Sequence, residues 1–101
     1  MFLAMNRFKI ARGHEDTFVA HWRARESYLN EVPGFVRFHL LKGPQTEEYT
    51  LFASHTEWES EAAFAAWTES EAFRKAHANA GKTPRHIYLG PPQLELFESV
   101  L

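Results

Sequence analysis

Three residues have side-chain types and positions that could support chemistry: Asn6, Trp67 and His77. Asn6 lies in the middle of an alternating segment, where it shares one face with Phe2 and Phe8. A carboxamide on that apolar face either bonds a neighbouring backbone group or acts as a donor into a cavity between sheet and helices. The sequence leaves both alternatives open.

His77 and Trp67 lie on one alanine-rich helical segment. At 3.6 residues per turn, His77 is centred on the same helix face as Ser70 and Phe73, in the last turn. A histidine there is either a core or helix-capping residue, or a ligand of a transition metal or haem iron. Trp67 lies about 15 Å away along the axis, at ~1.5 Å per residue. Its helical spacing is typical of a core residue.

The residue types present allow few kinds of metal site. The chain has no cysteine, and His77 has no second ligand three or four residues away, so it cannot hold a bare zinc or non-haem iron ion. Haem needs only one protein ligand. The other histidines show no metal-ligand spacing: His14, His21, His39, His55 and His86. Ser54 and His55 on one strand and His39 on another lie on strands predicted to pair and could face each other, but nothing in the sequence singles them out.

The composition argues against a nucleic-acid-binding protein and against a membrane protein. There are 11 lysine and arginine residues against 13 acidic ones, with no basic block, so a nucleic-acid partner is not expected. The sequence contains no run of 18 consecutive apolar residues, which a membrane-spanning helix would need. We therefore expect a cytoplasmic protein. A length of 101 residues predicts a single domain, 1–101.

Hydrophobic periodicity predicts six elements in the order βαββαβ. That order is typical of the α+β ferredoxin-like fold, in which one antiparallel sheet has both helices on a single face. The predicted strands are 2–10, 35–42, 48–58 and 93–101, and the predicted helices are 14–30 and 61–78. Ser60 is the expected N-cap of the second helix.

Most of the predicted strands are apolar on both faces. Phe38, for example, is expected to lie opposite Phe35 and Leu41, and Leu3 opposite Phe2. An antiparallel sheet with one face in water alternates apolar and polar residues instead. We therefore expect the second face to pack on an identical sheet in a two-fold homodimer.

The segments MNRF, EVPGF and AFAAWTESEAFRKAH together resemble the haem-degrading monooxygenases of the Isd type, in the antibiotic-biosynthesis-monooxygenase superfamily. The resemblance covers nearly the whole chain. It implies a dimeric α+β barrel with one haem per protomer between the sheet and the second helix. It also implies that His77 is the axial ligand of the haem iron, with Asn6 and Trp67 on the opposite side.

The resemblance further implies that haem is both substrate and cofactor. O2 would bind at the position that His77 leaves open, Asn6 would donate a hydrogen bond to it, and Trp67 would bend the macrocycle. An external electron donor, an unidentified reductase, is required because the chain has no flavin or nicotinamide motif. Candidate partners of the haem propionates are Arg25, Arg85, His86 and Tyr88.

Two alternatives share the same fold. A cofactor-independent quinol monooxygenase acting on polycyclic aromatic substrates would explain an aromatic pocket, but it would not explain His77. A non-catalytic haem-binding protein would explain His77, but it would not require Asn6.

Overall fold

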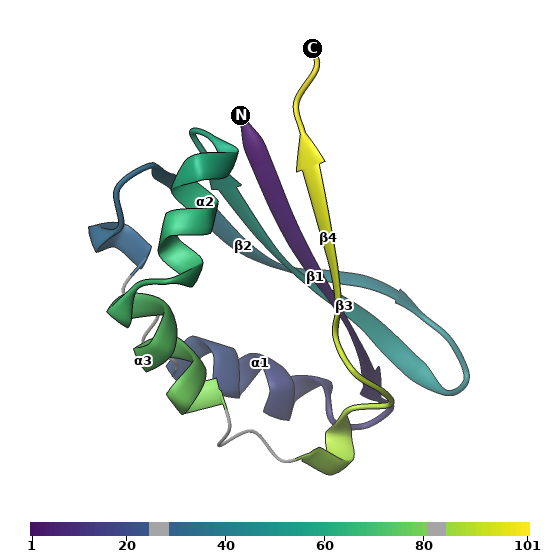
Figure 1. Ribbon diagram of the computed structural model, residues 1–101. Coiled ribbons are helices and arrows are strands. Elements are labelled where there is room, and N and C mark those ends of the chain that lie inside the picture. Colours follow the sequence, from purple (N-terminus) through teal and green to yellow (C-terminus); the bar gives the residue numbers. More distant parts are fainter. Residues whose placement is uncertain (25–28, 81–84) are drawn as a thin grey trace.

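The computed structural model describes residues 1–24, 29–80 and 85–101, of which 76–80 and 85 are described by their backbone alone. Four antiparallel strands form one sheet in the order β2-β3-β1-β4, and the helices lie on one side of it (Figure 1). This arrangement confirms the predicted ferredoxin-like class. The strands are β1 (Phe2–Ala11), β2 (Phe35–Gln45), β3 (Tyr49–Trp58) and β4 (Gln93–Glu98).

The two central strands fix which side chains face the helices. β1 pairs with β3 without interruption from Phe2, opposite Trp58, to Ala11, opposite Tyr49. Directly opposed residues in an antiparallel pair point to the same face, so even-numbered residues of both strands face the helices. The buried residues of β1 follow this alternation: Phe2, Ala4, Phe8 and Ile10.

Three α-helices cover the sheet: α1 (Glu15–Ala24), α2 (Glu61–Thr68) and α3 (Glu71–Ala80). Two 3₁₀ turns accompany them, η1 (Leu29–Glu31) and η2 (Arg85–Ile87). The prediction of one α-helix through residue 30 is wrong at its end, since residues 29–31 form a 3₁₀ turn and 25–28 lie outside the described residues. Ser60 is the N-cap of α2, as predicted, because its Oγ accepts a hydrogen bond from the Ala63 N–H at 3.1 Å.

The predicted single helix over 61–78 is wrong, because the chain breaks between α2 and α3 at Glu69 and Ser70. Ser70 explains the break. Its Oγ accepts a hydrogen bond from the Phe73 N–H at 3.2 Å, as an N-cap does, and donates to the Trp67 carbonyl at 2.6 Å. One helical periodicity therefore cannot be extended from Trp67 to His77.

Strand β2 departs from the alternation that was predicted for it. Its pairing with β3 shifts register between residues 35 and 37, so Phe38 lies opposite the buried Thr56. The Phe38 ring stacks on Trp22 of α1, with centroids 5.7 Å apart and an interplanar angle of 15°. The prediction that placed Phe38 on the face opposite Phe35 is therefore wrong. β2 also extends past residue 42, and β4 ends before residue 101.

The core between sheet and helices consists of two separate apolar clusters. We call the first the α2 cluster: Phe2, Leu29 and Trp58, packed with Val32, Phe35, Ala63, Phe64 and Trp67. We call the second the α1 cluster: Phe8, Ile10, Phe18, Phe52 and Ile87, packed with Val19, Trp22, Leu40 and Tyr88. The sheet surface between them is where a polar side chain is least expected.

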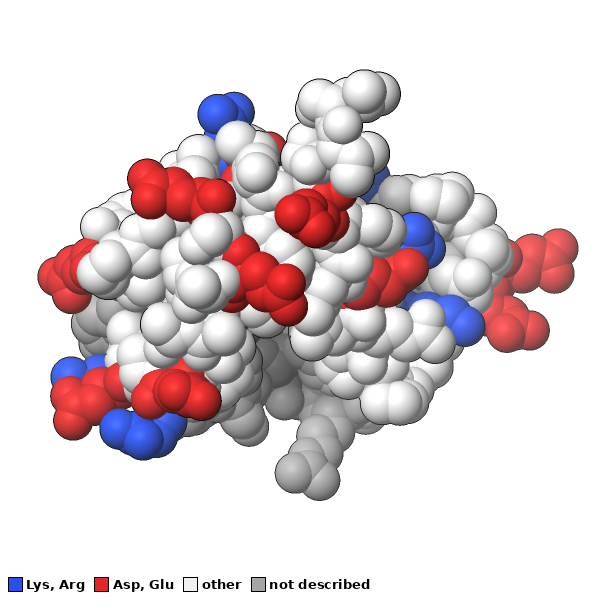
Figure 2. Space-filling view, turned by 45° about the horizontal axis from the view of Figure 1, so that its top comes forward, with Lys and Arg blue, Asp and Glu red and all other residues white. Residues whose placement is uncertain are grey.

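Figure 2 shows the charged side chains on one face of the molecule. Acidic and basic side chains are interspersed over the face shown in Figure 2 rather than gathered into a basic patch. Among residues 1–24, 29–80 and 85–101, no helix has the length and apolar character needed to cross a membrane.

We expect Gly34→Ala to destabilise the fold more than Gly13→Ala. Both glycines have positive φ, which costs about 1–2 kcal/mol for a residue with a Cβ. A Cβ on Gly34 would also collide with the Cβ of Ala63 in α2, and such overpacking adds about 1–3 kcal/mol. A Cβ on Gly13 meets no atom within 4 Å. Equal unfolding midpoints in urea for the two variants would contradict a close approach of β2 to α2.

Candidate functional site

Asn6 lies on β1, half-buried on the helix-covered face. Its Oδ1 atom is buried and accepts no hydrogen bond from the described part of the chain. Buried polar atoms are nearly always paired, and an unpaired one needs an explanation such as a bound molecule. The expectation that Asn6 bonds a neighbouring backbone group therefore has no support at Oδ1.

The sheet around Asn6 separates the two clusters with small or polar residues. On β3, Ser54 lies directly opposite Asn6 and is half-buried. The next row consists of Ala4 and Thr56, and the Thr56 hydroxyl donates to the Ala4 carbonyl at 3.3 Å and accepts from Trp58 Nε1 at 3.0 Å. The hydrogen-bonding capacity of Thr56 is therefore used within the fold.

Trp67 lies on α2 at the edge of the α2 cluster. Its ring contacts Trp58 of β3 with centroids 5.2 Å apart and Phe64 of its own helix at 6.0 Å. Across the helix break, Phe73 of α3 meets the Trp67 ring edge-on at 4.8 Å and 84°. Aromatic rings of β3, α2 and α3 therefore fix the orientation of the indole.

His77 lies in the last turn of α3. Its side chain is outside the described residues, so its role as a metal ligand stays a prediction. The structure does bring α3 against α2, through the contact of Phe73 with Trp67. It thus places Asn6 in the sheet layer, and Trp67 and His77 in the helix layer.

The candidate propionate partners differ in what the structure says of them. Arg25 lies outside the described residues, and Arg85 belongs to η2 with its side chain undescribed. His86 meets His14 edge-on at 5.2 Å. Tyr88 packs its ring on Phe8 and Phe18 of the α1 cluster, at 6.2 and 5.9 Å.

The described residues contain no group of three or more histidine or acidic side chains placed to hold a metal ion. His39 and His55 do face each other across β2 and β3, as expected, with ring centroids 6.1 Å apart.

Among the described residues, the Glu15 carboxyl group has a displaced pKa. The pKa of Glu15, at the start of α1, lies below its ordinary value of 4.5, chiefly because the Thr50 hydroxyl donates to Oε2 at 2.7 Å. The N–H groups of Glu15 itself and of Gly13 and the charge of Arg12 lower it further, while partial burial opposes them. Thr50 is fully buried, so this contact ties α1 to β3 beside the α1 cluster.

We expect acid to remove this contribution to stability. A carboxyl whose pKa is lowered in the fold stabilises the fold above its unfolded pKa, and the contribution is lost as pH falls through the folded pKa. Glu15→Gln should therefore lose less stability than the parent between about pH 7 and about pH 3, measured as urea midpoints. Asp16→Asn, exposed in the same turn, is the control. Equal losses for Glu15→Gln and the parent would contradict this role.

Ser54 is the residue near the site to which the sequence pattern assigned no role. The available signal was its even-numbered position on the third strand, which places it in the row of Phe52 and Trp58. Reading that signal requires the register of β3 against β1, which the sequence alone did not provide.

Comparison with known proteins agrees with this architecture. Residues 1–79 match the family model "Antibiotic biosynthesis monooxygenase". A "heme oxygenase (staphylobilin-producing)" of Staphylococcus haemolyticus is 30% identical, over 82% of this chain and 79% of that protein. A "heme-degrading monooxygenase" of Bacillus cereus is 28% identical, over 86% of this chain and 80% of that protein.

A solved structure extends the likeness to three dimensions. The haem degrader MhuD of Mycobacterium tuberculosis, with two haems bound in its active site, superposes with a TM-score of 0.74 and 29% identity. The match covers 100% of this chain and 97% of that one. With the family model, the relatives and the sheet order in agreement, the chain belongs to the antibiotic biosynthesis monooxygenase family.

Proposed function

We propose that this protein is a haem-degrading monooxygenase that binds haem between the sheet and the helices, with Asn6, Trp67 and His77 as its functional residues. The observation that carries the proposal is the half-buried Asn6, whose Oδ1 accepts no hydrogen bond from the described residues. It lies between the two apolar clusters, where the fold itself gains nothing from a carboxamide. The names of the relatives support haem as the substrate.

The residues present fit haem better than a bare metal ion. A porphyrin is a flat, largely apolar disc, and Phe64, Trp67 and Phe73 offer aromatic rings at the edge of the α2 cluster. The described residues hold no group of three or more histidine or acidic side chains that would bind an ion by itself. Haem iron needs one protein ligand, and the family resemblance assigns that role to His77, which lies on α3.

Each residue has a distinct proposed task. His77 would bind the iron of the substrate and hold the macrocycle in one place. Asn6 would offer its side-chain amide N–H as a fixed donor to charge that develops on oxygen. Trp67, oriented by its contacts with Trp58 and Phe73, would pack on the ring. Bound haem supplies the iron at which O2 reacts, with electrons from an external donor.

Hemin titration of the purified apoprotein tests this proposal. We expect a saturable Soret band, followed by loss of that band when ascorbate is added in air. A protein without any such band would contradict haem as the substrate and would favour the quinol monooxygenase alternative. A band that never bleaches would contradict degradation and would favour a non-catalytic haem-binding protein.

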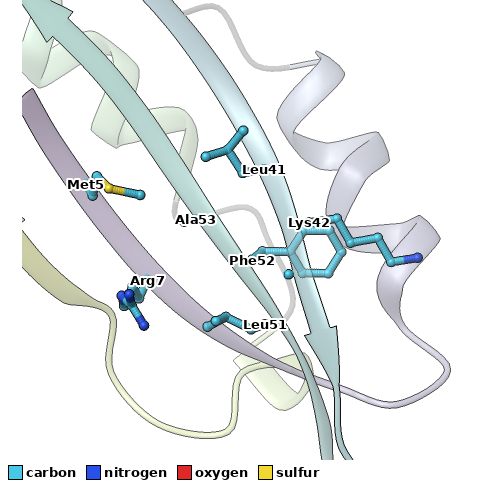
Figure 3. Close-up of a pocket in the computed structure, with 8 residues that line it drawn as sticks. Met5, Arg7, Leu41, Lys42, Leu51, Phe52 and Ala53 are labelled. Atoms are coloured by element: carbon cyan, nitrogen blue, oxygen red, sulfur yellow. The ribbon is translucent and has the colours of Figure 1, made fainter.

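We also propose that the sheet face away from the helices forms the interface of a homodimer. This face carries Leu41 and Phe97, which are 40% and 46% exposed. Met5, Leu41 and Leu51 line a depression of about 260 Å³ on it, shown in Figure 3 with the helices behind the sheet. Two ion pairs flank the apolar area, Arg7–Glu95 and Arg37–Glu57. A second identical sheet would cover both kinds of surface.

We expect Leu41→Glu to convert the dimer to a monomer without unfolding it. The introduced charge would be buried in the proposed interface but solvated in the monomer, since Leu41 is exposed there. Ala62→Glu, on the exposed side of α2, is the control and should stay dimeric. Light scattering after size-exclusion chromatography measures the mass. A parent protein with the mass of a monomer would rule out the interface.

A further inference from the structure

One row of side chains crosses the sheet face that points away from the helices. His39 of β2 lies opposite His55 of β3, and His55 in turn lies opposite Met5 of β1. Directly opposed residues point to the same face, with Cβ atoms about 5 Å apart. Figure 3 shows the Met5 side chain, with its sulfur atom, in front of the sheet and the helices behind it. Three strands therefore bring two imidazoles and one thioether together.

The separation of the two imidazole rings suits a shared metal ion. Metal–nitrogen bonds to histidine are about 2.0–2.1 Å long, so an ion lies about 3 Å from each ring centroid and the centroids lie up to about 6 Å apart. The rings of His39 and His55 are stacked at 27°, with centroids 6.1 Å apart. Met5 is half-buried beside them, and its unbranched side chain with three rotatable bonds can turn its sulfur toward His55. The site can therefore form on this backbone by side-chain rotation alone.

The charges beside this row do not oppose a bound cation. Arg37, in the next row on β2, is paired with Glu57 of β3. Arg7, in the next row on β1, is paired with Glu95, the residue opposite Met5 on β4. Since each arginine has a carboxylate partner, its charge is compensated before an ion arrives.

The three donors favour copper(I) over other metal ions. Imidazole binds zinc, copper, nickel and iron, whereas a soft thioether selects copper(I). We propose that His39, His55 and Met5 form a binding site for one copper(I) ion per protomer. All three donors come from one chain, so the site does not depend on the homodimer. It does not depend on haem either, because it lies on the other face of the sheet.

Competition with bicinchoninate, which forms a coloured complex with copper(I), tests the site in untagged protein without haem. We expect the parent to take one copper(I) ion per protomer from the dye. His39→Ala and His55→Ala should each bind copper(I) at least about tenfold more weakly, the smallest loss typical of a disturbed metal site. A parent protein that takes no copper(I), or parental affinity in either variant, would overturn the proposal.

The other pair of histidine rings supplies the comparison. His14, beside the start of α1, meets His86 edge-on with centroids 5.2 Å apart. We expect His14→Ala to bind copper(I) like the parent. Loss of the ion in His14→Ala would show that this second pair holds it and would overturn the assignment to His39 and His55.

Met5→Leu isolates the contribution of the thioether. The substitution conserves volume, so the fold should persist, which urea unfolding checks. We expect about tenfold weaker binding of copper(I) but unchanged binding of Zn²⁺, which does not favour a thioether. X-ray absorption at the copper edge should show a sulfur neighbour in the parent that is absent from Met5→Leu. Identical copper spectra and affinities, or equal weakening of copper(I) and Zn²⁺ binding, would refute Met5 as a ligand.

Discussion

Replacing His77 with alanine is expected to abolish the binding of haem through a protein nitrogen. Loss of a residue that merely supports a metal ligand costs about 10–100-fold in affinity, so loss of the ligand itself should cost at least about 100-fold. The fold should persist, because Phe73 packs α3 against Trp67 and the substitution leaves that contact in place. Hemin titration followed at the Soret band measures affinity, and thermal unfolding checks the fold.

A histidine on the far side of the sheet provides the matched control. His39 is exposed and pairs with His55 away from the helices, so His39→Ala should bind hemin like the parent. Added imidazole should restore a Soret band to His77→Ala by replacing the missing ring. Wild-type Soret position and affinity in His77→Ala would show that another residue binds the iron.

Much of the fold could be predicted because local patterns and tertiary packing agree. The alternation in β1 predicts its buried face, which the structure confirms at Phe2, Phe8 and Ile10. Ser60 is the expected N-cap of α2. The order of strands and helices leaves few topologies, and the ferredoxin-like one is observed.

The two wrong predictions, a single helix over 61–78 and the face assigned to Phe38, have a shared physical cause. In both places local hydrogen bonding or strand pairing interrupts the regular helix or strand pattern that the sequence suggests. Ser70 satisfies two of its hydrogen bonds by ending α2 and starting α3, and helical periodicity alone does not register this preference. The register shift after Phe35 moves Phe38 to the other face, where Trp22 stacks on it. Strand alternation cannot locate such a shift because it assumes constant pairing.

A residue of the candidate site could be predicted only where its polarity differs from that of its sequence neighbours on the same face. Asn6 is recognisable from sequence as an amide in an apolar row. Ser54 is not, because serine is unremarkable in a strand until its partner is known to be Asn6. His77 was singled out on a helical wheel that the break at Ser70 invalidates, so the case for it rests on the family resemblance and on its place in α3.

Asn6→Ala is expected to bind haem normally and to degrade it about 100-fold more slowly. Asn6 does not bond the iron in the proposed arrangement, so affinity should not depend on it. Removal of one preorganised donor typically costs about 3 kcal/mol of transition-state stabilisation, which corresponds to that change in rate. Single-turnover loss of the Soret band with saturating reductant measures the rate, and hemin titration measures the affinity.

Three further substitutions test the Asn6 donor and the bulk of Trp67. Asn6→Asp keeps the size and loses the N–H donors, so it should be as slow as Asn6→Ala, whereas Asn30→Ala, exposed on η1, should match the parent. Trp67→Phe keeps an aromatic ring with less bulk, so it should bind haem and degrade it more slowly, because it presses less on the macrocycle. A non-catalytic haem-binding protein gives no such separation of binding from turnover. Parental rates in both Asn6→Ala and Trp67→Phe would refute the roles proposed for them even if the protein degrades haem.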